Sequence, residues 1–329
     1  MTEQISVVLC THNGSRFIDS QLRSILTQNA APDELVLSDD ASSDDTVAKA
    51  QRVVEKFAPP GMAVTVLRNE SALGVALNFE QAIRASSGQL IALSDQDDIW
   101  SANRVSRAVR EFALRPKLDL LFSDARLVDQ DGHSLERSLF DVLEIFADTL
   151  TALHDGHGSS VFIRRNVATG ATIMFRRRLL ESALPFPADW VHDEWLGIVA
   201  SMVGQVDALE EQLIDYRQHS SNQIGVDYPT LRRKVRRTLE SRGARNARLS
   251  GQFSQLMKRF EERQDLVSID QLARLRAKSN FESARLHLPG ARARRVRQVL
   301  NLYRRGWYDE FASQGKMDML RDLLQSHRD

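Results

Sequence analysis

The sequence lacks most signs of an extracellular or membrane-spanning protein. Its 329 residues include a single cysteine, Cys10, which excludes an internal disulfide framework and a metal site built from several thiolates. No run of about 18 apolar residues is present, so we expect no segment that spans a bilayer. Residues 1–4 carry no basic segment, and the apolar run Ile5–Cys10 is too short for a signal peptide. We therefore expect a cytoplasmic protein.

Net charge is also absent, but the two ends of the chain differ strongly in their balance of basic and acidic residues. The 44 basic and 44 acidic residues balance overall, whereas residues 231–329 hold 24 Lys and Arg against 11 Asp and Glu. Segments that differ this much usually have different functions. The acidic part is suited to hold cations. The basic part is suited to an anionic partner, either a membrane surface or a nucleic acid.

The first 125 residues alternate between short apolar runs and segments with helical spacing. Strands are predicted over Ile5–Cys10, Glu34–Ser38, Val64–Leu67, Leu90–Ser94 and Asp119–Ser123, and helices over Phe17–Gln28, Thr46–Phe57, Val75–Ser86 and Asn103–Arg115. Such alternation, with uninterrupted apolar strands, predicts an α/β fold whose sheet is mostly parallel and buried.

The rest of the chain divides into a mixed segment and a helical one. Further elements are predicted as strands over Thr169–Phe175, Val206–Leu209 and Gln212–Tyr216, and as helices over Arg176–Ser182 and Val191–Val203. We interpret His154–His157 as a flexible loop. From Leu231 onward the pattern is helical only, with a break at Pro289-Gly290. We therefore predict one domain over 1–228, subdivided at 125, and a basic all-helical region over 229–329.

Acidic loops follow two strands of the predicted sheet. Asp39 and Asp40 come directly after the second strand, and Asp95-Gln96-Asp97-Asp98 follows the fourth. In open α/β sheets, ligands bind beyond the carboxyl ends of the strands. Clustered carboxylates repel one another unless a cation intervenes, and hard oxygen ligands favour Mg²⁺ or Mn²⁺, which can bridge to a diphosphate. The alternative is that Asp97 or Asp98 caps the following helix.

Three segments in this order resemble glycosyltransferase family 2. They are Val7–Gly14, Ser38–Thr46 and Ser94–Trp100. The resemblance implies the GT-A fold, a nucleotide-binding α/β domain with a D-x-D motif. The form SDQDDIW is most similar to the bacterial rhamnosyltransferase-like branch, which makes O-antigen and other surface polysaccharides. The Q-x-x-R-W motif of processive members is absent.

The resemblance continues to about residue 225. Similar segments are Thr169–Arg176 on the acceptor side, His192–Trp195 where the family carries its catalytic base, and Tyr216–Asn222 as the closing motif. It implies a nucleotide-sugar site and a metal site. The residues expected to bind the nucleotide sugar are Thr11, Asp39, Asp40, Gly74, Asn78 and Asp95, and those expected to hold the metal are Asp97 and His219.

Chemistry assigns roles to these side chains. A carboxylate accepts hydrogen bonds, so Asp40 beside Asp39 should accept from the imide N–H of uracil or thymine. Asp193 is the expected general base, taking the acceptor hydroxyl proton as that oxygen attacks the anomeric carbon. Its alternative role is to cap a helix over 194–203, and His192 and Glu194 are alternative bases.

The basic region offers two interpretations. Arg232–Arg237 and Arg292–Arg297 are dense basic runs interleaved with apolar residues. They are either solvated faces pairing with the acidic domain or a surface for the anionic inner leaflet, near a lipid-linked saccharide acceptor. No nucleic-acid recognition motif is present.

Together these features and the resemblance predict a metal-dependent glycosyltransferase that uses Mg²⁺ or Mn²⁺, and the resemblance implies that transfer occurs with inversion. The first donor to consider is dTDP-rhamnose, and the acceptor is a hydroxyl of a surface-polysaccharide or O-antigen type saccharide. The alternatives are a UDP-hexose-using transferase of the same fold, a sugar nucleotidyltransferase, and a binding module without activity. Only Arg16 is basic near Thr11–Ser15, which disfavours the nucleotidyltransferase.

Overall fold

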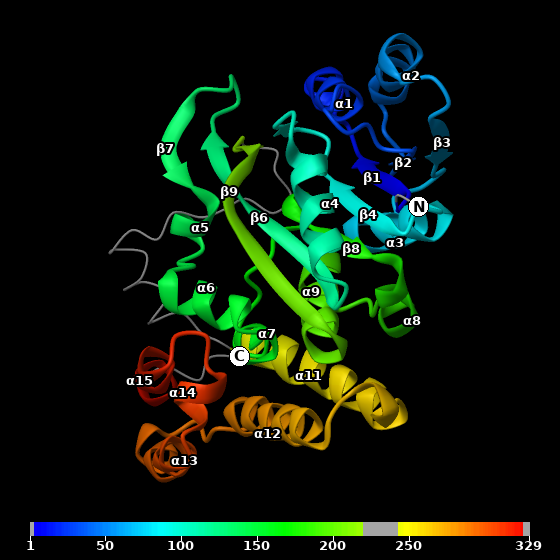
Figure 1. Ribbon diagram of the computed structural model, residues 1–329. Coiled ribbons are helices and arrows are strands. Elements are labelled where there is room, and N and C mark those ends of the chain that lie inside the picture. Colours follow the sequence, from blue (N-terminus) through cyan, green and yellow to red (C-terminus); the bar gives the residue numbers. More distant parts are fainter. Residues whose placement is uncertain (1–2, 220–242, 325–329) are drawn as a thin grey trace. The chain divides into compact units, whose positions relative to one another are not determined.

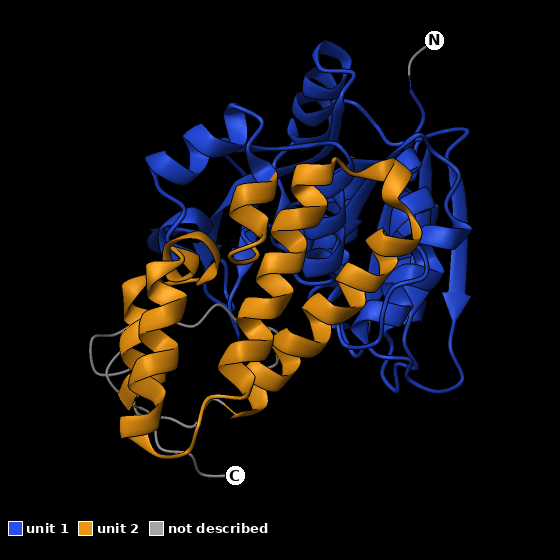
Figure 2. Cartoon of the chain, turned by 90° about the horizontal axis from the view of Figure 1, so that it is seen from below, with its two compact units in different colours: residues 1–158, 167–226 blue, residues 159–166, 227–329 orange. Residues whose placement is uncertain are grey.

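A computed structural model describes residues 3–219 and 243–324 of the protein (Figure 1). The chain forms two compact units, coloured separately in Figure 2. Unit 1 comprises Met1–Gly158 and Val167–Val226, and unit 2 comprises Ser159–Asn166 and Asp227–Asp329. The domain boundary predicted at residue 228 lies outside the described residues.

Unit 1 is built on one nine-stranded mixed sheet. Its strands are β1 Ile5–Thr11, β2 Glu34–Asp39, β3 Ala63–Arg68, β4 Leu90–Ser94, β5 Ile99–Trp100, β6 Leu118–Val128, β7 Ser134–Ser138, β8 Met174–Arg176 and β9 Gln205–Arg217. The order is β3-β2-β1-β4-β8-β6-β9-β5, and β7 pairs with β6. The first four strands are parallel to one another, whereas β8 runs antiparallel to both β4 and β6.

Helices connect these strands and cover the sheet (Figure 1). They are α1 Ile18–Leu26, α2 Thr46–Phe57, α3 Val75–Ala85, α4 Arg104–Leu114, α5 Leu139–Val142, α6 Ala147–His154, α8 Leu180–Ala183 and α9 His192–Val203. The short helix α7 Gly158–Phe162 begins at the last residue of a unit 1 segment and continues in unit 2. All seven residues of β1 are buried, as expected for a parallel strand covered on both faces. The predicted α/β architecture is therefore confirmed.

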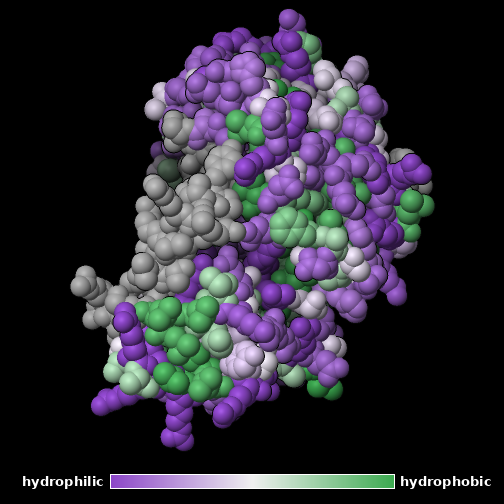
Figure 3. Space-filling model, turned by 90° about the vertical axis from the view of Figure 1, so that its left-hand side faces the viewer, coloured by the Kyte–Doolittle hydropathy of each residue, from purple (hydrophilic) through white to green (hydrophobic). Residues whose placement is uncertain are grey.

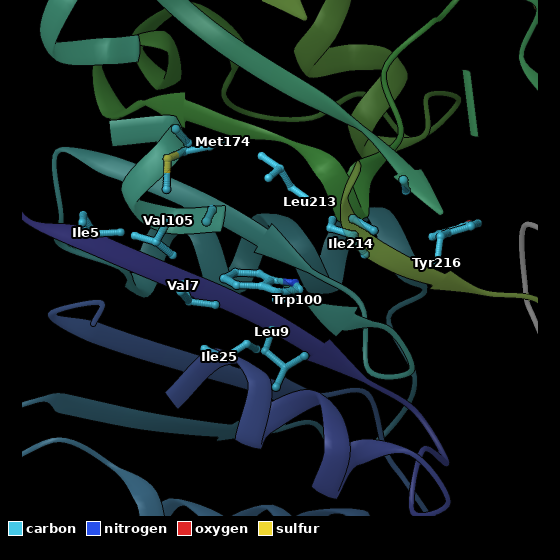
Figure 4. Close-up of a cluster of buried hydrophobic side chains, with 14 of the residues drawn as sticks. Ile5, Val7, Leu9, Ile25, Trp100, Val105, Met174, Leu213, Ile214 and Tyr216 are labelled. Carbon is cyan, nitrogen blue, oxygen red and sulfur yellow. The ribbon is translucent and has the colours of Figure 1, made fainter. Parts of the chain in front are cut away.

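The hydrophobic core lies between the sheet and its helices. Figure 4 shows Val7 and Leu9 of β1 facing Ile25 of α1 and the ring of Trp100. Met174 of β8 and Leu213 of β9 continue the same cluster, as labelled in Figure 4. This packing fixes the strand ends, so the loops that follow them are held in place relative to one another.

Three local predictions for unit 1 are wrong. Gly170–Thr172 forms a 3₁₀ turn where we predicted a strand, because the Gly170 N–H bonds to the Asp193 carboxylate. The two strands predicted on either side of Glu210-Glu211 are one strand, β9, because the exposed Glu pair is accommodated as an irregularity opposite β6. His154 is not in a flexible loop, because it ends α6 with Nδ1 2.6 Å from Asp207 Oδ1.

The described part of unit 2 is entirely helical, as predicted. Besides the end of α7 it contains α11 Gly243–Glu262, α12 Ile269–Leu286, α13 Arg292–Arg304, α14 Trp307–Phe311 and α15 Lys316–Leu324 (Figure 2). The predicted break at Pro289-Gly290 separates α12 from α13. Aromatic side chains form the core: Phe281 makes edge contacts with Tyr308 at 5.2 Å and packs near Phe311 at 6.0 Å. No described helix of the chain is long and apolar enough to cross a bilayer.

Candidate active site

The ends of β1, β2 and β4 bring the predicted nucleotide residues to one edge of the sheet. Thr11 and Asp39 are the last residues of β1 and β2 and are paired in the parallel register. The Thr11 hydroxyl donates to Asp39 Oδ1 at 2.8 Å. Asp39 also accepts from the Ser42 N–H at 3.0 Å and the Ser42 hydroxyl at 2.6 Å. The Asp39 carboxylate therefore shapes the loop after β2.

Asp40 holds the segment between β3 and α3. Its carboxylate accepts from Asn69 Nδ2 at 3.0 Å, from the Leu73 N–H at 2.7 Å and from the Gly74 N–H at 2.9 Å. Gly74 has a φ of 85°, a conformation that glycine adopts without a steric penalty. A carboxylate has about four lone-pair positions, so Asp40 keeps one acceptor position beyond these three bonds.

Asn78 of α3 fastens the same loop to the sheet. It is buried; its Nδ2 donates to the Ser38 carbonyl at 3.0 Å, and its Oδ1 accepts from the Ser38 hydroxyl at 2.6 Å. Asn69 Nδ2 reaches the same Oδ1 at 3.3 Å. The five residues predicted around the nucleotide, from Thr11 to Asn78, thus belong to one connected hydrogen-bond network.

The acidic loop after β4 is linked to the loop after β1 by Gln96. Its Oε1 accepts from the His12 N–H at 2.8 Å, and its Nε2 donates to the His12 carbonyl at 3.0 Å. A Cβ at Gly14 would lie 2.1 Å from Gln96 Oε1, so a larger residue there would displace the Gln96 side chain from this position. The sequence analysis missed Gln96, although its place inside an acidic motif was a usable signal.

Asp97 and His219 are adjacent, although 122 positions separate them in the chain. His219 Nε2 lies 2.9 Å from Asp97 Oδ2, and both side chains are largely buried. One carboxylate oxygen and one imidazole nitrogen suit a divalent cation whose other ligands come from diphosphate and water. Among the described residues, no group of three His, Cys, Asp or Glu side chains is placed to hold a metal. The pair therefore fits a shared metal site rather than a cage made of protein alone.

Buried charge surrounds this pair. Burial, and then the nearby charges of Asp97 and Asp193, raise the pKa of Asp95 to about 7. Burial likewise raises the pKa of Asp98, whose Oδ1 accepts from the Arg217 N–H at 3.0 Å. Asp98 therefore ties the acidic loop to the end of β9 and does not cap the next helix, whose N-cap residue is Asn103.

Two arginines that the sequence analysis did not single out support the acidic loop. Arg217 donates through Nε to the Asp97 carbonyl at 2.8 Å. Arg104 is buried, lies 3.5 Å over the Trp100 ring and donates through Nη2 to the Ala171 carbonyl at 2.8 Å. Burial lowers the pKa of Arg104 to about 9, opposed by the charges of Asp98 and Asp95. Arg217 lies inside the segment Tyr216–Asn222 that resembles the closing motif, whereas nothing in the local sequence distinguishes Arg104 from a surface arginine.

Asp193 lies in the first turn of α9. Its Oδ2 accepts from the Gly170 N–H at 3.1 Å, and its Oδ1 accepts from the Glu194 N–H at 2.6 Å. Burial, and then the charge of Glu194, raise its pKa to about 7. Since the charge of Asp193 contributes to the raised pKa of Asp95, the two carboxylates are close enough to interact electrostatically. The N-cap residue of α9 is Val191, so the alternative role of Asp193 as a helix cap is wrong.

The residues on either side of the acidic pair Asp193-Glu194 are packed in the protein interior. His192 is buried against the Phe79 ring at 3.9 Å, and burial lowers its pKa to about 3. Trp195 is fully buried and donates through Nε1 to the Ala183 carbonyl at 2.7 Å. Trp100 and Trp190 are also buried. The aromatic rings beside the acidic motifs therefore belong to the core and are not exposed for stacking on a sugar.

A sequence profile of glycosyl transferase family 2 matches residues 6–182, and the chain belongs to this family. An uncharacterised glycosyltransferase of Nostoc is 24% identical over 228 residues, which are 67% of this chain and 66% of that protein. The Escherichia coli UDP-Glc:alpha-D-GlcNAc-diphosphoundecaprenol beta-1,3-glucosyltransferase WfgD is 28% identical over 128 residues, 39% of this chain and 48% of its own length. The match spans 59% to 66% of four curated relatives, the Nostoc protein included.

Solved structures show the same fold. The mannosyltransferase PcManGT from Pyrobaculum calidifontis, in complex with GDP-Man and Mn²⁺, has a TM-score of 0.54 and 18% identity, covering 98% of this chain and 86% of its own. Staphylococcus aureus TarS 1–349, in complex with UDP-GlcNAc, has a TM-score of 0.53 and 17% identity, covering 99% and 93%. The predicted GT-A fold is thereby confirmed.

Proposed function

We propose that this chain transfers a sugar from a nucleotide donor to an acceptor hydroxyl with inversion, using Asp193 as the general base. The observation that carries the proposal is the position of Asp193: a carboxylate with a pKa of about 7, oriented by the Gly170 and Glu194 N–H groups and close enough to Asp95 to interact electrostatically. A base with a pKa near the working pH is ionised when needed and still accepts a proton readily.

The donor's nucleoside occupies the network from Thr11 to Asn78 in this proposal. The free acceptor position of Asp40 takes the imide N–H of uracil or thymine, and Gly74 permits close approach of the backbone. Asp39 and Thr11 hold the loop that borders the base. Asp95, beyond the end of β4, faces the ribose and diphosphate.

The donor's diphosphate is placed beside Asp97 and His219. Their adjacency, and the Mn²⁺ named with the structurally similar PcManGT, support Mg²⁺ or Mn²⁺ as the cofactor. A divalent ion bound there supplies charge stabilisation for the departing diphosphate. Arg217 keeps the Asp97 backbone in place by donating a hydrogen bond to the Asp97 carbonyl oxygen.

The transfer step needs only one proton acceptor. The acceptor oxygen forms a bond to the anomeric carbon while the bond from that carbon to the diphosphate oxygen breaks. The hydroxyl proton passes to Asp193, and the nucleoside diphosphate leaves with the bonding pair. His192 is a poor alternative base, because its ring is buried and its nitrogens find no hydrogen-bond partner among the described residues.

The donor and acceptor are proposed from the motifs and the relatives. The form SDQDDIW supports dTDP-rhamnose as the first donor to test. The names of WfgD and TarS support a UDP-hexose or its N-acetyl derivative as the second. A lipid-linked saccharide of the surface-polysaccharide or O-antigen type is the proposed acceptor, which would place the protein at the inner face of the cell membrane.

Calorimetric titration of dTDP, UDP and GDP, each with and without Mn²⁺, tests the site. We expect one nucleotide to bind in a metal-dependent way, and Asp193→Asn to keep that affinity within about twofold while turnover falls by 10²-fold or more. Asp155→Asn, which changes an exposed carboxylate at the end of α6, is the matched control. Near-normal turnover of Asp193→Asn would exclude it as the base, and no nucleotide binding by the folded chain would overturn the proposal.

A further inference from the structure

The exposed apolar side chains of the protein gather on two helices of unit 2. Among the described residues, six of the twelve large hydrophobic side chains that are exposed lie on α13 and α15. They are Val296, Leu300 and Tyr303 on α13, and Met317, Leu320 and Leu324 on α15, each between 38% and 50% exposed. Figure 3 shows an apolar patch at this end of unit 2, with hydrophilic side chains projecting beside it.

Each helix exposes these residues as a continuous stripe. Positions 296, 300 and 303 follow one another at spacings of four and three, and so do 317, 320 and 324 at three and four, which places each set on one helix face. The buried face of α13 is formed by Arg295, Val299 and Leu302 instead. The two helices pack on each other, so one helix pair carries both stripes.

Helix α15 buries charged side chains and exposes apolar ones, the reverse of an ordinary surface helix. Its buried face carries Asp318, Arg321 and Asp322, whereas Met317, Leu320 and Leu324 are exposed. Arg321 Nη1 donates to Asp318 Oδ1 at 3.1 Å, and Asp322 accepts from Arg285. These charged side chains are paired inside unit 2, so the apolar face of α15 is the exposed one. An exposed apolar face of this kind is typical of a surface that binds a partner or a membrane.

The exposed charges that α13 and α15 themselves carry are all positive. The exposed charged side chains of α13 and α15 are Arg292, Arg294, Arg297, Arg304 and Lys316. Arg292 lies one turn before Val296, and Arg304 one turn after Leu300, so both extend the apolar stripe. Arg295, within the same basic run, is buried and donates to the Gly290 carbonyl at 2.9 Å. The other predicted run, Arg232–Arg237, lies outside the described residues.

We propose that the α13–α15 face docks on the surface of an anionic lipid bilayer. An apolar stripe with arginines at its edges matches an interface that offers acyl chains beneath a layer of phosphate groups. A second copy of this chain would bring two cationic rims together, and a nucleic acid would leave the apolar stripe in water. The inference names the surface for the membrane association suggested above, but it does not depend on the transfer reaction.

Flotation of the full chain with lipid vesicles tests the proposal. We expect it to float with vesicles of mixed phosphatidylcholine and phosphatidylglycerol, less with phosphatidylcholine alone, and less at high salt. Leu300→Gln/Leu320→Gln and, separately, Arg297→Gln/Arg304→Gln should each lower the partition coefficient roughly tenfold. The matched controls are Leu114→Gln and Arg110→Gln, which change exposed residues of α4.

Nucleotide titration of the same preparations separates this proposal from the proposed function. If the variants bind nucleotide as the parent does, a loss of flotation is specific to the surface. Vesicle binding that the α13 and α15 variants do not change would overturn the proposal and assign the interaction elsewhere in the chain. A dimer in sedimentation that these variants abolish, without any vesicle binding, would assign the face to a second copy and also overturn it.

Discussion

At the scale of single residues, the site depends on carboxylates held at unusual proton affinities. Asp193 and Asp95 are both partly buried, and desolvation raises the pKa of each to about 7. In the proposed reaction the ionised form of Asp193 is the base, so its proton affinity sets the pH at which transfer begins. The same burial also makes the ionised carboxylate unfavourable for folding, so activity and stability respond to pH in opposite directions.

We expect turnover to rise with pH through about 7 and to level off above it. For stability, a folded-state pKa above the unfolded value of about 4 means that the folded state binds more protons between pH 4 and 7. Raising the pH through this window therefore destabilises the protein, and the loss is complete above pH 7.

Asp193→Asn should lack the part of this loss that comes from Asp193, keep the part from Asp95, and exceed the parent in unfolding free energy at pH 8 by on the order of 1–3 kcal/mol. Denaturant titrations at several pH values measure the difference. A constant difference between pH 4 and 8 would contradict the raised pKa.

Gly170 is the second residue on which the base depends. Its N–H orients Asp193, and a Cβ there would lie 2.5 Å from His192 Nε2 and 3.2 Å from Cε1. Because the His192 ring is stacked on Phe79, we expect Gly170→Ala to destabilise the protein by about 1–3 kcal/mol and to lower kcat more than donor affinity.

The control for this substitution is Gly251→Ala, where a Cβ meets nothing within 4 Å inside α11. It should stabilise the helix by about 0.5–1 kcal/mol. Thermal melts and steady-state kinetics measure both variants. Combining Gly170→Ala with His192→Ala should recover part of the lost stability, and no recovery would show that the clash lies elsewhere.

At the scale of elements, hydrogen bonds between loops stabilise the proposed nucleotide site at the carboxyl ends of β1, β2 and β4. Asp40 fixes the segment from Asn69 to Gly74, Gln96 joins the loops after β1 and β4, and Arg217 ties β9 to the acidic loop. Each link spans at least about 30 positions of sequence. The conformation of each loop therefore depends on contacts that form only when the sheet is assembled.

Asp40→Asn tests the first of these links. An amide offers only one acceptor oxygen, so it cannot serve the Leu73 and Gly74 N–H groups as the carboxylate does. We expect faster hydrogen exchange at these two amides, a destabilisation of about 1–2 kcal/mol and weaker nucleotide binding. Asp45→Asn, an exposed change in the same loop, is the control. Unchanged exchange at Leu73 and Gly74 would contradict the role of Asp40.

At the scale of the whole molecule, the two units rest on different kinds of interior. Unit 1 has an apolar core around its sheet, shown in Figure 4. Unit 2 combines aromatic packing with a buried ionic network in which Arg285 donates to Asp322 at 2.7 Å and Lys278 to Glu282 at 2.6 Å. Removing one partner of a buried pair leaves the other charge uncompensated, so this network is the sensitive part of unit 2.

Asp322→Asn should therefore destabilise unit 2 by about 3–5 kcal/mol, because Arg285 and the Tyr308 hydroxyl both donate to that carboxylate. Scanning calorimetry should show one transition lowered while nucleotide binding by unit 1 is kept. Arg276→Gln, which breaks an exposed pair with Glu261, should change stability by less than about 1 kcal/mol. Loss of nucleotide binding in parallel with unit 2 would show that the units are not independent.

The sequence by itself determined the strand–helix alternation of the first 125 residues, the acidic loops and the helical C-terminal region, because hydrophobic periodicity and loop polarity are local properties. Its motifs also indicated the family. The tertiary structure decided what depends on contacts between distant positions: the Gly170 bond to Asp193, the adjacency of Asp97 and His219, and the support from Arg104 and Arg217.

The same division applies to the basic region. Its charge was evident from composition, but only packing decided that Arg295 is buried while Val296 and Leu300 are exposed. Adjacent positions of one helix lie in different environments, because only one side of the helix packs on the rest of unit 2. The proton affinity of a carboxylate likewise depends on how deeply the fold buries it, which composition and spacing do not specify.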